Sequence, residues 1–242
     1  MANRQRAEAR RKAAAKAARK EGGAKKTWMW VTIAVVVVVA VVGIVIATGG
    51  SSSNTPAADG STPTTVQSVI PDSQPATITG TALPDYQTTG TDTAIGLTAP
   101  TVEGLNFAGQ TISLNPSKGP YMVVFLAHWC PHCNAEVPRL LNWKHSGAVP
   151  AELNVIGVAT AVSKTSVNYP PASWFSNKGW EWPVMVDTSL GDGAAGKVAQ
   201  AFGATGWPYI VLVGKDGKVK MRTSGEVAIA DLQKMVDAAL KA

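Results

Sequence analysis

The feature that most constrains this chain is a pair of cysteines placed directly after an apolar run. Cys130 and Cys133 are the only cysteines among its 242 residues, and they follow the run Tyr121–Ala127. That run is typical of a buried strand, and the residues after the pair have a helical pattern. A strand that leads through Cys-x-x-Cys into a helix places the first sulfur at the helix N-terminus. Because free N–H groups and the helix dipole favour a thiolate there, the sequence predicts a redox-active pair.

A metal site, a haem site and a structural disulfide are the other uses of such a pair. A structural zinc site takes about four Cys or His ligands, whereas the whole chain has two Cys and three His. Covalent haem attachment requires a His directly after the second cysteine, where this chain has Asn134. A disulfide that closes so short a loop constrains the unfolded chain little. We therefore expect no metal and no bound cofactor, only a redox-active disulfide between Cys130 and Cys133.

The positive charge of the chain lies in its first residues. The formal net charge is +6, but residues 1–26 carry ten Lys or Arg and two Glu, which gives +8. The remaining residues hold 12 basic and 14 acidic side chains, a net charge of −2. Since the globular part lacks the basic excess that holds phosphates, we expect no nucleic-acid partner.

An uncharged segment of 20 residues, 28–47, follows the basic tail and begins with Trp28 and Trp30. At about 1.5 Å per residue, a helix of this length crosses a hydrocarbon core of about 30 Å. A basic flank on one side only places the N-terminus in the cytoplasm and the rest outside. We expect a single-pass protein of the cell membrane with an extracytoplasmic catalytic domain. The alternative is a signal peptide cleaved near Ala47, which would also export the domain.

Composition divides the chain into a basic cytoplasmic tail (1–27), a transmembrane helix (28–47), a flexible linker (48–93) and a folded domain (94–242). Small and polar residues dominate the linker, which has no apolar periodicity. In the folded domain strands alternate with helices, which predicts an α/β domain with a central mixed sheet and helices on both faces. The expected strands are 101–105, 110–114, 121–127, 153–160, 183–187, 209–213 and 219–223, and the expected helices are 131–145, 170–178, 194–202 and 229–241.

Three motifs resemble the thioredoxin superfamily, in particular its membrane-tethered TlpA-like branch of ResA and CcmG type proteins. The first is the strand and redox pair, Phe125–Cys133; the second is Glu136 with Pro138; the third is Gly203–Pro208, which is similar to the cis-proline loop. The resemblance covers about residues 94–242. It implies a thioredoxin-like fold in which Val155–Asp187 contains the helix and strand that this branch inserts.

The resemblance also implies roles for the site residues. Cys130 is expected to be the exposed attacking thiolate and Cys133 the partner that resolves the mixed disulfide, an order that their positions on the helix support. Glu136 is expected to manage protons near the sulfurs, with a plain surface carboxylate as the alternative. A cis Pro208 would expose a strand-like backbone edge opposite Cys130 for an extended substrate.

Trp129 and Trp207 are expected to form the walls of the substrate groove. The dipeptide Pro131-His132 departs from the TlpA-like pattern and resembles that of DsbA-type oxidants. An imidazole there can donate to the Cys130 thiolate, which stabilises the reduced form and makes the disulfide a stronger oxidant. A passive surface histidine is the alternative interpretation.

We therefore expect a thiol–disulfide oxidoreductase that acts on protein thiols and disulfides and needs a redox partner to reset its pair. The Pro-His dipeptide favours an oxidase or isomerase, whereas the branch resemblance favours a reductase, for example in cytochrome c maturation. A peroxidase and a non-catalytic binding module are the remaining classes.

The glycine run Gly191–Gly196 fits a dinucleotide-binding motif. Its candidate acid, Asp216, lies in a hairpin turn, so we do not expect dinucleotide binding.

Overall fold

The computed structural model describes residues 70–241. Its central strand is β4 (Tyr121–Leu126), in which every residue is buried, as expected for an apolar run covered on both faces. Parallel strands β5 (Asn154–Ala159) and β6 (Val184–Val186) continue the sheet on one side. On the other side, β7 (Tyr209–Val213) pairs antiparallel with β4, and β8 (Val219–Ser224) pairs antiparallel with β7.

The far side of the sheet is built by a hairpin. Strands β2 (Thr101–Leu105) and β3 (Thr111–Leu114) pair antiparallel, as the sequence predicts, and the short helix Pro116–Lys118 leads from β3 towards β4. Strand β1 (Thr77–Thr79) pairs with β2, which also reaches β6. The resulting strand order is β1-β2-β6-β5-β4-β7-β8, with β3 attached to β2.

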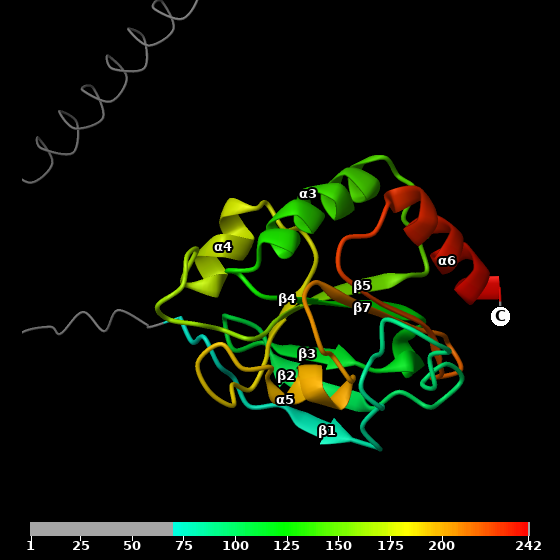
Figure 1. The fold of residues 1–242 in the computed structure, drawn as a ribbon, viewed down its shortest axis with the longest axis horizontal. Helices are drawn as coiled ribbons and strands as arrows, with labels where there is room; N and C mark the ends of the chain where they lie inside the picture. Colours follow the sequence, from blue (N-terminus) through cyan, green and yellow to red (C-terminus); the bar gives the residue numbers. More distant parts are fainter. Residues whose placement is uncertain (1–69, 242) are drawn as a thin grey trace, which may run out of the picture. The chain divides into compact units, whose positions relative to one another are not determined.

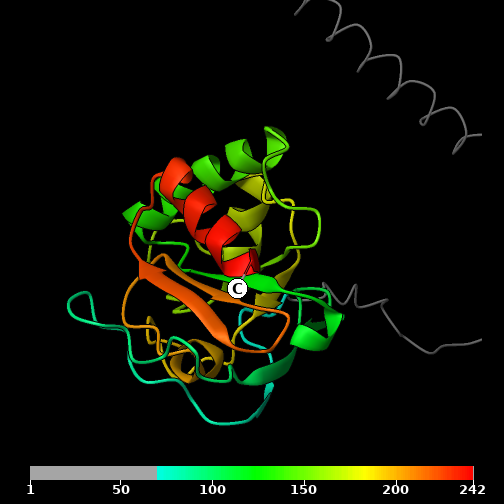
Figure 2. The same cartoon turned by 90° about the vertical axis from the view of Figure 1, so that its right-hand side faces the viewer.

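Helices cover both faces of this sheet. Figures 1 and 2 show α3 (Pro131–His145), α4 (Pro171–Asn177) and α6 (Ile229–Lys241) on one face and α5 (Lys197–Ala201) on the other. Each face has its own apolar core, one containing Leu140 and Leu232 and the other containing Phe125 and Phe202. The predicted α/β, thioredoxin-like architecture with a central mixed sheet is therefore confirmed.

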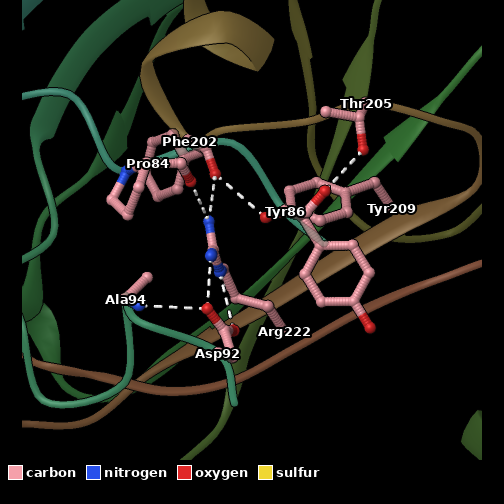
Figure 3. Close-up of polar contacts among 8 residues, drawn as sticks. All are labelled: Pro84, Tyr86, Asp92, Ala94, Phe202, Thr205, Tyr209 and Arg222. Atoms are coloured by element: carbon pink, nitrogen blue, oxygen red, sulfur yellow. Dashed lines mark hydrogen bonds and ion pairs between the residues drawn. The ribbon is translucent and has the colours of Figure 1, made fainter. Parts of the chain in front are cut away.

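The predicted linker, 48–93, is wrong in its C-terminal part. Residues 77–79 form β1, Leu83 is buried, and Asp92 pairs with the buried Arg222 of β8. Figure 3 shows the Arg222 guanidinium held between the Asp92 carboxylate and the carbonyl oxygens of Pro84 and Phe202. Composition could not reveal this contact, because Asp92 and Arg222 are 130 positions apart.

The predicted membrane-spanning helix, 28–47, and the basic tail lie outside the described residues. Within residues 70–241, every helix is too short or too polar to cross a bilayer.

Candidate redox site

The strand register brings the predicted site residues to one edge of the sheet. Phe125 of β4 lies opposite Tyr209 of β7, and Tyr209 lies opposite Ser224 of β8. Because neighbouring antiparallel strands begin and end at the same edge, the loop after β4 meets the loop before β7 and the loop after β8. These three loops carry Cys130, Pro208 and Glu226.

The two cysteines differ in burial as well as in position. Cys130 is the N-cap residue of α3 and Cys133 lies in its first turn; both are free thiols. The exposed fraction is 6% for Cys130 and 0% for Cys133. The first cysteine is therefore the more accessible one, as expected, but it is much less exposed than the sequence suggested. Burial raises the pKa of the Cys133 thiol, and the charges of Cys130 and Glu136 raise it further, so Cys133 is held as a thiol.

The predicted groove residues lie around Cys130. The Trp207–Pro208 peptide bond is cis, and the Cys130 Sγ donates a hydrogen bond of 3.5 Å to the Trp207 carbonyl oxygen. The indole of Trp129 donates to the Ala161 carbonyl at 2.7 Å. Both indoles are half-buried and pack against the core that contains the two cysteines. Two loops thus meet at the less buried sulfur: the loop after β4, which contains Trp129, and the loop before β7, which contains Trp207 and Pro208.

Glu136 is completely buried, so the interpretation as a surface carboxylate does not hold. Its Oε2 accepts a hydrogen bond from the Val227 N–H at 3.4 Å and lies 3.5 Å from Arg139 Nη1. Its Oε1 has no hydrogen-bond partner within the described residues. Burial raises the pKa of Glu136, and the Val227 N–H and Arg139 oppose this shift. The carboxyl group therefore keeps its proton to a higher pH than an ordinary glutamate, which suits proton exchange with a buried thiol.

His132 has a different partner from the one that the sequence predicts. Its exposed imidazole places Nδ1 at 2.9 Å from Oε1 of Glu226, and the other oxygen of Glu226 lies 2.7 Å from Arg139 Nη2. Among the described residues no hydrogen bond joins His132 to Cys130, which is a thiol here, and Nδ1 instead faces a carboxylate from the loop after β8. Donation from His132 to a Cys130 thiolate stays a prediction. Pro131, the first residue of α3, is exposed at the helix start.

Sequence reasoning missed two residues that shape this site. Glu226 is 94 positions from His132, and nothing in its local sequence marks it. Asn134 lies next to Cys133; its Nδ2 donates to the Cys130 carbonyl at 2.9 Å, and its Oδ1 accepts from Trp174 Nε1 at 2.9 Å. An Asn side chain near a helix start can bond the backbone carbonyl four residues earlier, and this local pattern was the available clue.

His128 supports the groove wall rather than the chemistry. It is buried, its Nδ1 donates to the Val167 carbonyl at 2.9 Å, and its Nε2 accepts from the Ser163 N–H at 3.3 Å. Burial lowers its pKa. A neutral imidazole therefore fixes the loop that carries Ala161, the hydrogen-bond partner of Trp129.

The glycine run Gly191–Gly196 is explained by packing. A Cβ atom on Gly196 would lie 2.3 Å from the carboxyl carbon of Asp187. The Asp187 carboxylate accepts hydrogen bonds from the N–H groups of Val198 and Ala199 at the start of α5. It thus takes the position in which a dinucleotide phosphate would bind. No group of three or more metal-ligating side chains occurs in the part of the chain that the structure describes.

The fold and the cysteine pair define a thioredoxin-like protein. The AhpC/TSA family matches residues 95–222, and the chain belongs to this family. No curated protein sequence matches the chain.

Several solved structures are similar to it. A thiol:disulfide interchange protein of the thioredoxin family from Chlorobium tepidum TLS is 25% identical, with 60% of this chain and 96% of that chain covered and a TM-score of 0.47. The thioredoxin domain of a thiol-disulfide oxidoreductase from Bacteroides vulgatus is 22% identical, with coverages of 60% and 96% and a TM-score of 0.46. StoA from Bacillus subtilis is 14% identical, with coverages of 56% and 96% and a TM-score of 0.45.

Proposed function

We propose that the protein is a membrane-tethered, extracytoplasmic thiol–disulfide oxidoreductase that oxidises protein substrates through Cys130 and Cys133. One observation carries the proposal. The less buried sulfur, Cys130, lies at the start of α3 against the Trp207 carbonyl, and the fully buried Cys133 is within the same turn. An extended substrate that docks along the backbone at Trp207–Pro208 presents its own sulfur to Cys130.

The proposed reaction moves an electron pair from the substrate to the protein. A substrate thiolate attacks the Cys130 sulfur of the oxidised pair, the bond between the two protein sulfurs breaks, and Cys133 leaves as a thiolate and takes up a proton. A second substrate thiolate attacks the substrate sulfur of the mixed disulfide and releases Cys130. The substrate gains a disulfide, and a redox partner must later reoxidise Cys130 and Cys133.

Glu136 is the proposed source of the proton that Cys133 takes up. Burial raises the pKa of both groups, so the carboxyl group is protonated where an ordinary glutamate is ionised, and the thiol holds the proton strongly. The Glu136 Oε1, which has no hydrogen-bond partner among the residues that the structure describes, can carry this proton. Protonation of the leaving sulfur assists the attack on Cys130, because a thiol with a high pKa leaves slowly as an anion.

The reduction potential tests the direction of electron flow. Cys130 lies at a helix N-terminus, a position that favours an oxidising disulfide in proteins of this kind. Equilibration with glutathione is expected to give a potential clearly above the value of about −270 mV for thioredoxin. A thioredoxin-like value would assign the protein to reductases of the TlpA-like kind.

Peroxide reduction is the alternative chemistry for a cysteine in this family. Peroxiredoxins use an arginine close to the reactive sulfur. Both arginines within residues 70–241 have carboxylate partners instead: Arg139 binds Glu226, and Arg222 binds Asp92. We therefore favour disulfide exchange, and an assay of peroxide consumption with a thiol reductant separates the two activities.

The experiment that tests exchange uses the full chain in detergent, with glutathione disulfide to oxidise its cysteine pair. The substrate is a reduced, unfolded protein whose native form contains disulfides. Wild type is expected to restore substrate disulfides, and Cys130→Ser to abolish this activity. With the disulfide-containing form of the same substrate, Cys133→Ser should accumulate a mixed disulfide, because the Cys130 thiolate attacks a substrate disulfide and no second cysteine resolves the product. A reductant should release the substrate. If Cys130→Ser retains the activity of wild type, the proposed function is wrong.

The membrane topology has a separate test. Because the chain contains only two cysteines, a membrane-impermeant maleimide added to intact cells reports where Cys130 lies. Labelling of Cys133→Ser without cell lysis supports an extracytoplasmic domain. Labelling only after lysis would place the domain inside the cell.

A further inference from the structure

We propose that Glu226 is a positioning residue of the redox pair, which holds His132 in a carboxylate contact and so limits the oxidising strength that the Pro-His dipeptide confers. This inference rests on the proposed function and deepens it. Its basis is the pair of contacts that Glu226 makes to α3: Oε1 to His132 Nδ1 at 2.9 Å and Oε2 to Arg139 Nη2 at 2.7 Å.

The backbone around Glu226 is fixed from both sides. The Gly225 N–H donates to the Pro208 carbonyl at 2.8 Å, and the Val227 N–H donates to Glu136 at 3.4 Å. Gly225 has a φ of 86°, a conformation that a side chain rarely adopts. The loop after β8 is therefore attached to the cis-proline loop on one side of Glu226 and to the buried carboxyl group on the other. This arrangement sets the Glu226 carboxylate over the first turns of α3.

The contact changes the electrostatic field at the redox pair in one direction. His132 lies between the two cysteines in sequence, and a protonated imidazole there would stabilise the Cys130 thiolate. With Glu226 as its partner, the charge of a protonated His132 is offset by the carboxylate, which also pairs with Arg139. Removal of the Glu226 charge therefore makes the field at Cys130 more positive in either protonation state of His132. The reduced form of the pair gains stability, and the disulfide becomes a stronger oxidant.

The test measures the equilibrium constant of the full-length protein with glutathione at pH 7, from the fraction of reduced pair trapped by alkylation. Glu226→Gln is expected to raise the constant for reduction of the protein by glutathione about threefold, the scale of a screened, partly exposed ion pair. His132→Asn alone is expected to change this constant by less than Glu226→Gln does. In the double variant the rise caused by Glu226→Gln should be smaller, because the part that acts through the charge of the imidazole is lost.

Glu181→Gln is the matched control. Glu181 also pairs with a histidine and a second cation, His145 at 2.7 Å and Lys144 at 2.8 Å, but at the other end of α3. This variant should leave the glutathione equilibrium unchanged. The proposal fails if Glu226→Gln leaves the constant at the wild-type value, or if its effect persists in full beside His132→Asn. Since glutathione acts on the protein alone, a failure of exchange with protein substrates would leave this measurement intact.

Discussion

Two charged clusters of this domain contain a buried side chain, yet their hydrogen bonding differs. The Arg222 side chain is 1% exposed, and its guanidinium donates to Asp92 and to the carbonyl oxygens of Pro84 and Phe202. Glu136 is equally buried, but one of its oxygens has no partner within residues 70–241, and the other accepts a long hydrogen bond from Val227. The buried group of the first cluster thus has several hydrogen-bond partners, whereas that of the second has an oxygen with none among the described residues.

We infer from this difference that the first cluster serves stability and propose that the second serves chemistry. A buried charge with a full set of partners fixes the chain around it; here it fastens residues 84–94 to β8 (Figure 3). A buried carboxyl group that lacks a partner costs stability, and proteins keep such groups where a proton has to move. The unsatisfied carboxyl group is the one beside the cysteines.

The largest expected effect is the loss of the satisfied cluster. Arg222→Met keeps the volume of the side chain but leaves Asp92 without its cation and the Pro84 carbonyl without its donor. We expect the free energy of unfolding to fall by about 3 kcal/mol, as for other buried pairs that lose one partner. Urea titration measures this change. A midpoint equal to that of wild type would show that residues 84–94 contribute little to stability.

A smaller loss is expected for Asp92→Asn, about 1 to 2 kcal/mol at pH 7. The Arg222 hydrogen bond holds the pKa of Asp92 below its usual value, so the stabilisation is present above the ordinary pKa and is lost as the pH falls through the lowered one. The difference between wild type and variant should therefore shrink in acid. Urea midpoints of wild type and variant from pH 7 down to pH 3 measure this difference. A difference in stability that does not change with pH would contradict the ion pair.

The opposite sign is expected for Glu136→Gln. Because burial raises the pKa of Glu136, the folded protein binds this proton more tightly than the unfolded chain, and wild type loses stability as the pH rises above the ordinary carboxyl pKa. The variant should be more stable than wild type by about 1 kcal/mol at pH 7 and equal to it near pH 4. Exchange activity should fall in the same variant. Full exchange activity in the variant would show that Glu136 takes no part in the proton transfer.

The smallest changes of stability are expected at two exposed carboxylates: Glu226 at the edge of the second cluster, and Glu181 at the other end of α3. Glu226→Gln and Glu181→Gln each remove a carboxylate from a solvent-screened pair with a histidine and a second cation. Their urea midpoints should match that of wild type. A redox effect of Glu226→Gln at unchanged stability would separate its positioning role from a structural one.

Local sequence patterns were sufficient for most elements of this fold. The apolar runs predicted β4, β5 and β7, and the helical spacing predicted α3 and α6, because each signal lies within one element. α5 begins at Lys197, later than predicted, since the chain before it bends around the Asp187 carboxylate. β1 was missed because three residues pair with a distant strand and have no pattern of their own.

The sequence by itself determined the redox pair, its position at the start of a helix, and the loop of Trp207 and Pro208, since each depends on neighbouring residues. Only the tertiary structure decided the surroundings of that pair: the burial of Glu136, the capture of His132 by Glu226, and the fastening of residues 84–94 by Arg222. The physical reason is tertiary contact. Arg222, within β8, binds a segment 130 positions away, and the register of β4, β7 and β8 gathers loops from distant parts of the chain at one edge of the sheet. Charges that meet there are far apart in sequence, and their mutual effects arise only on folding.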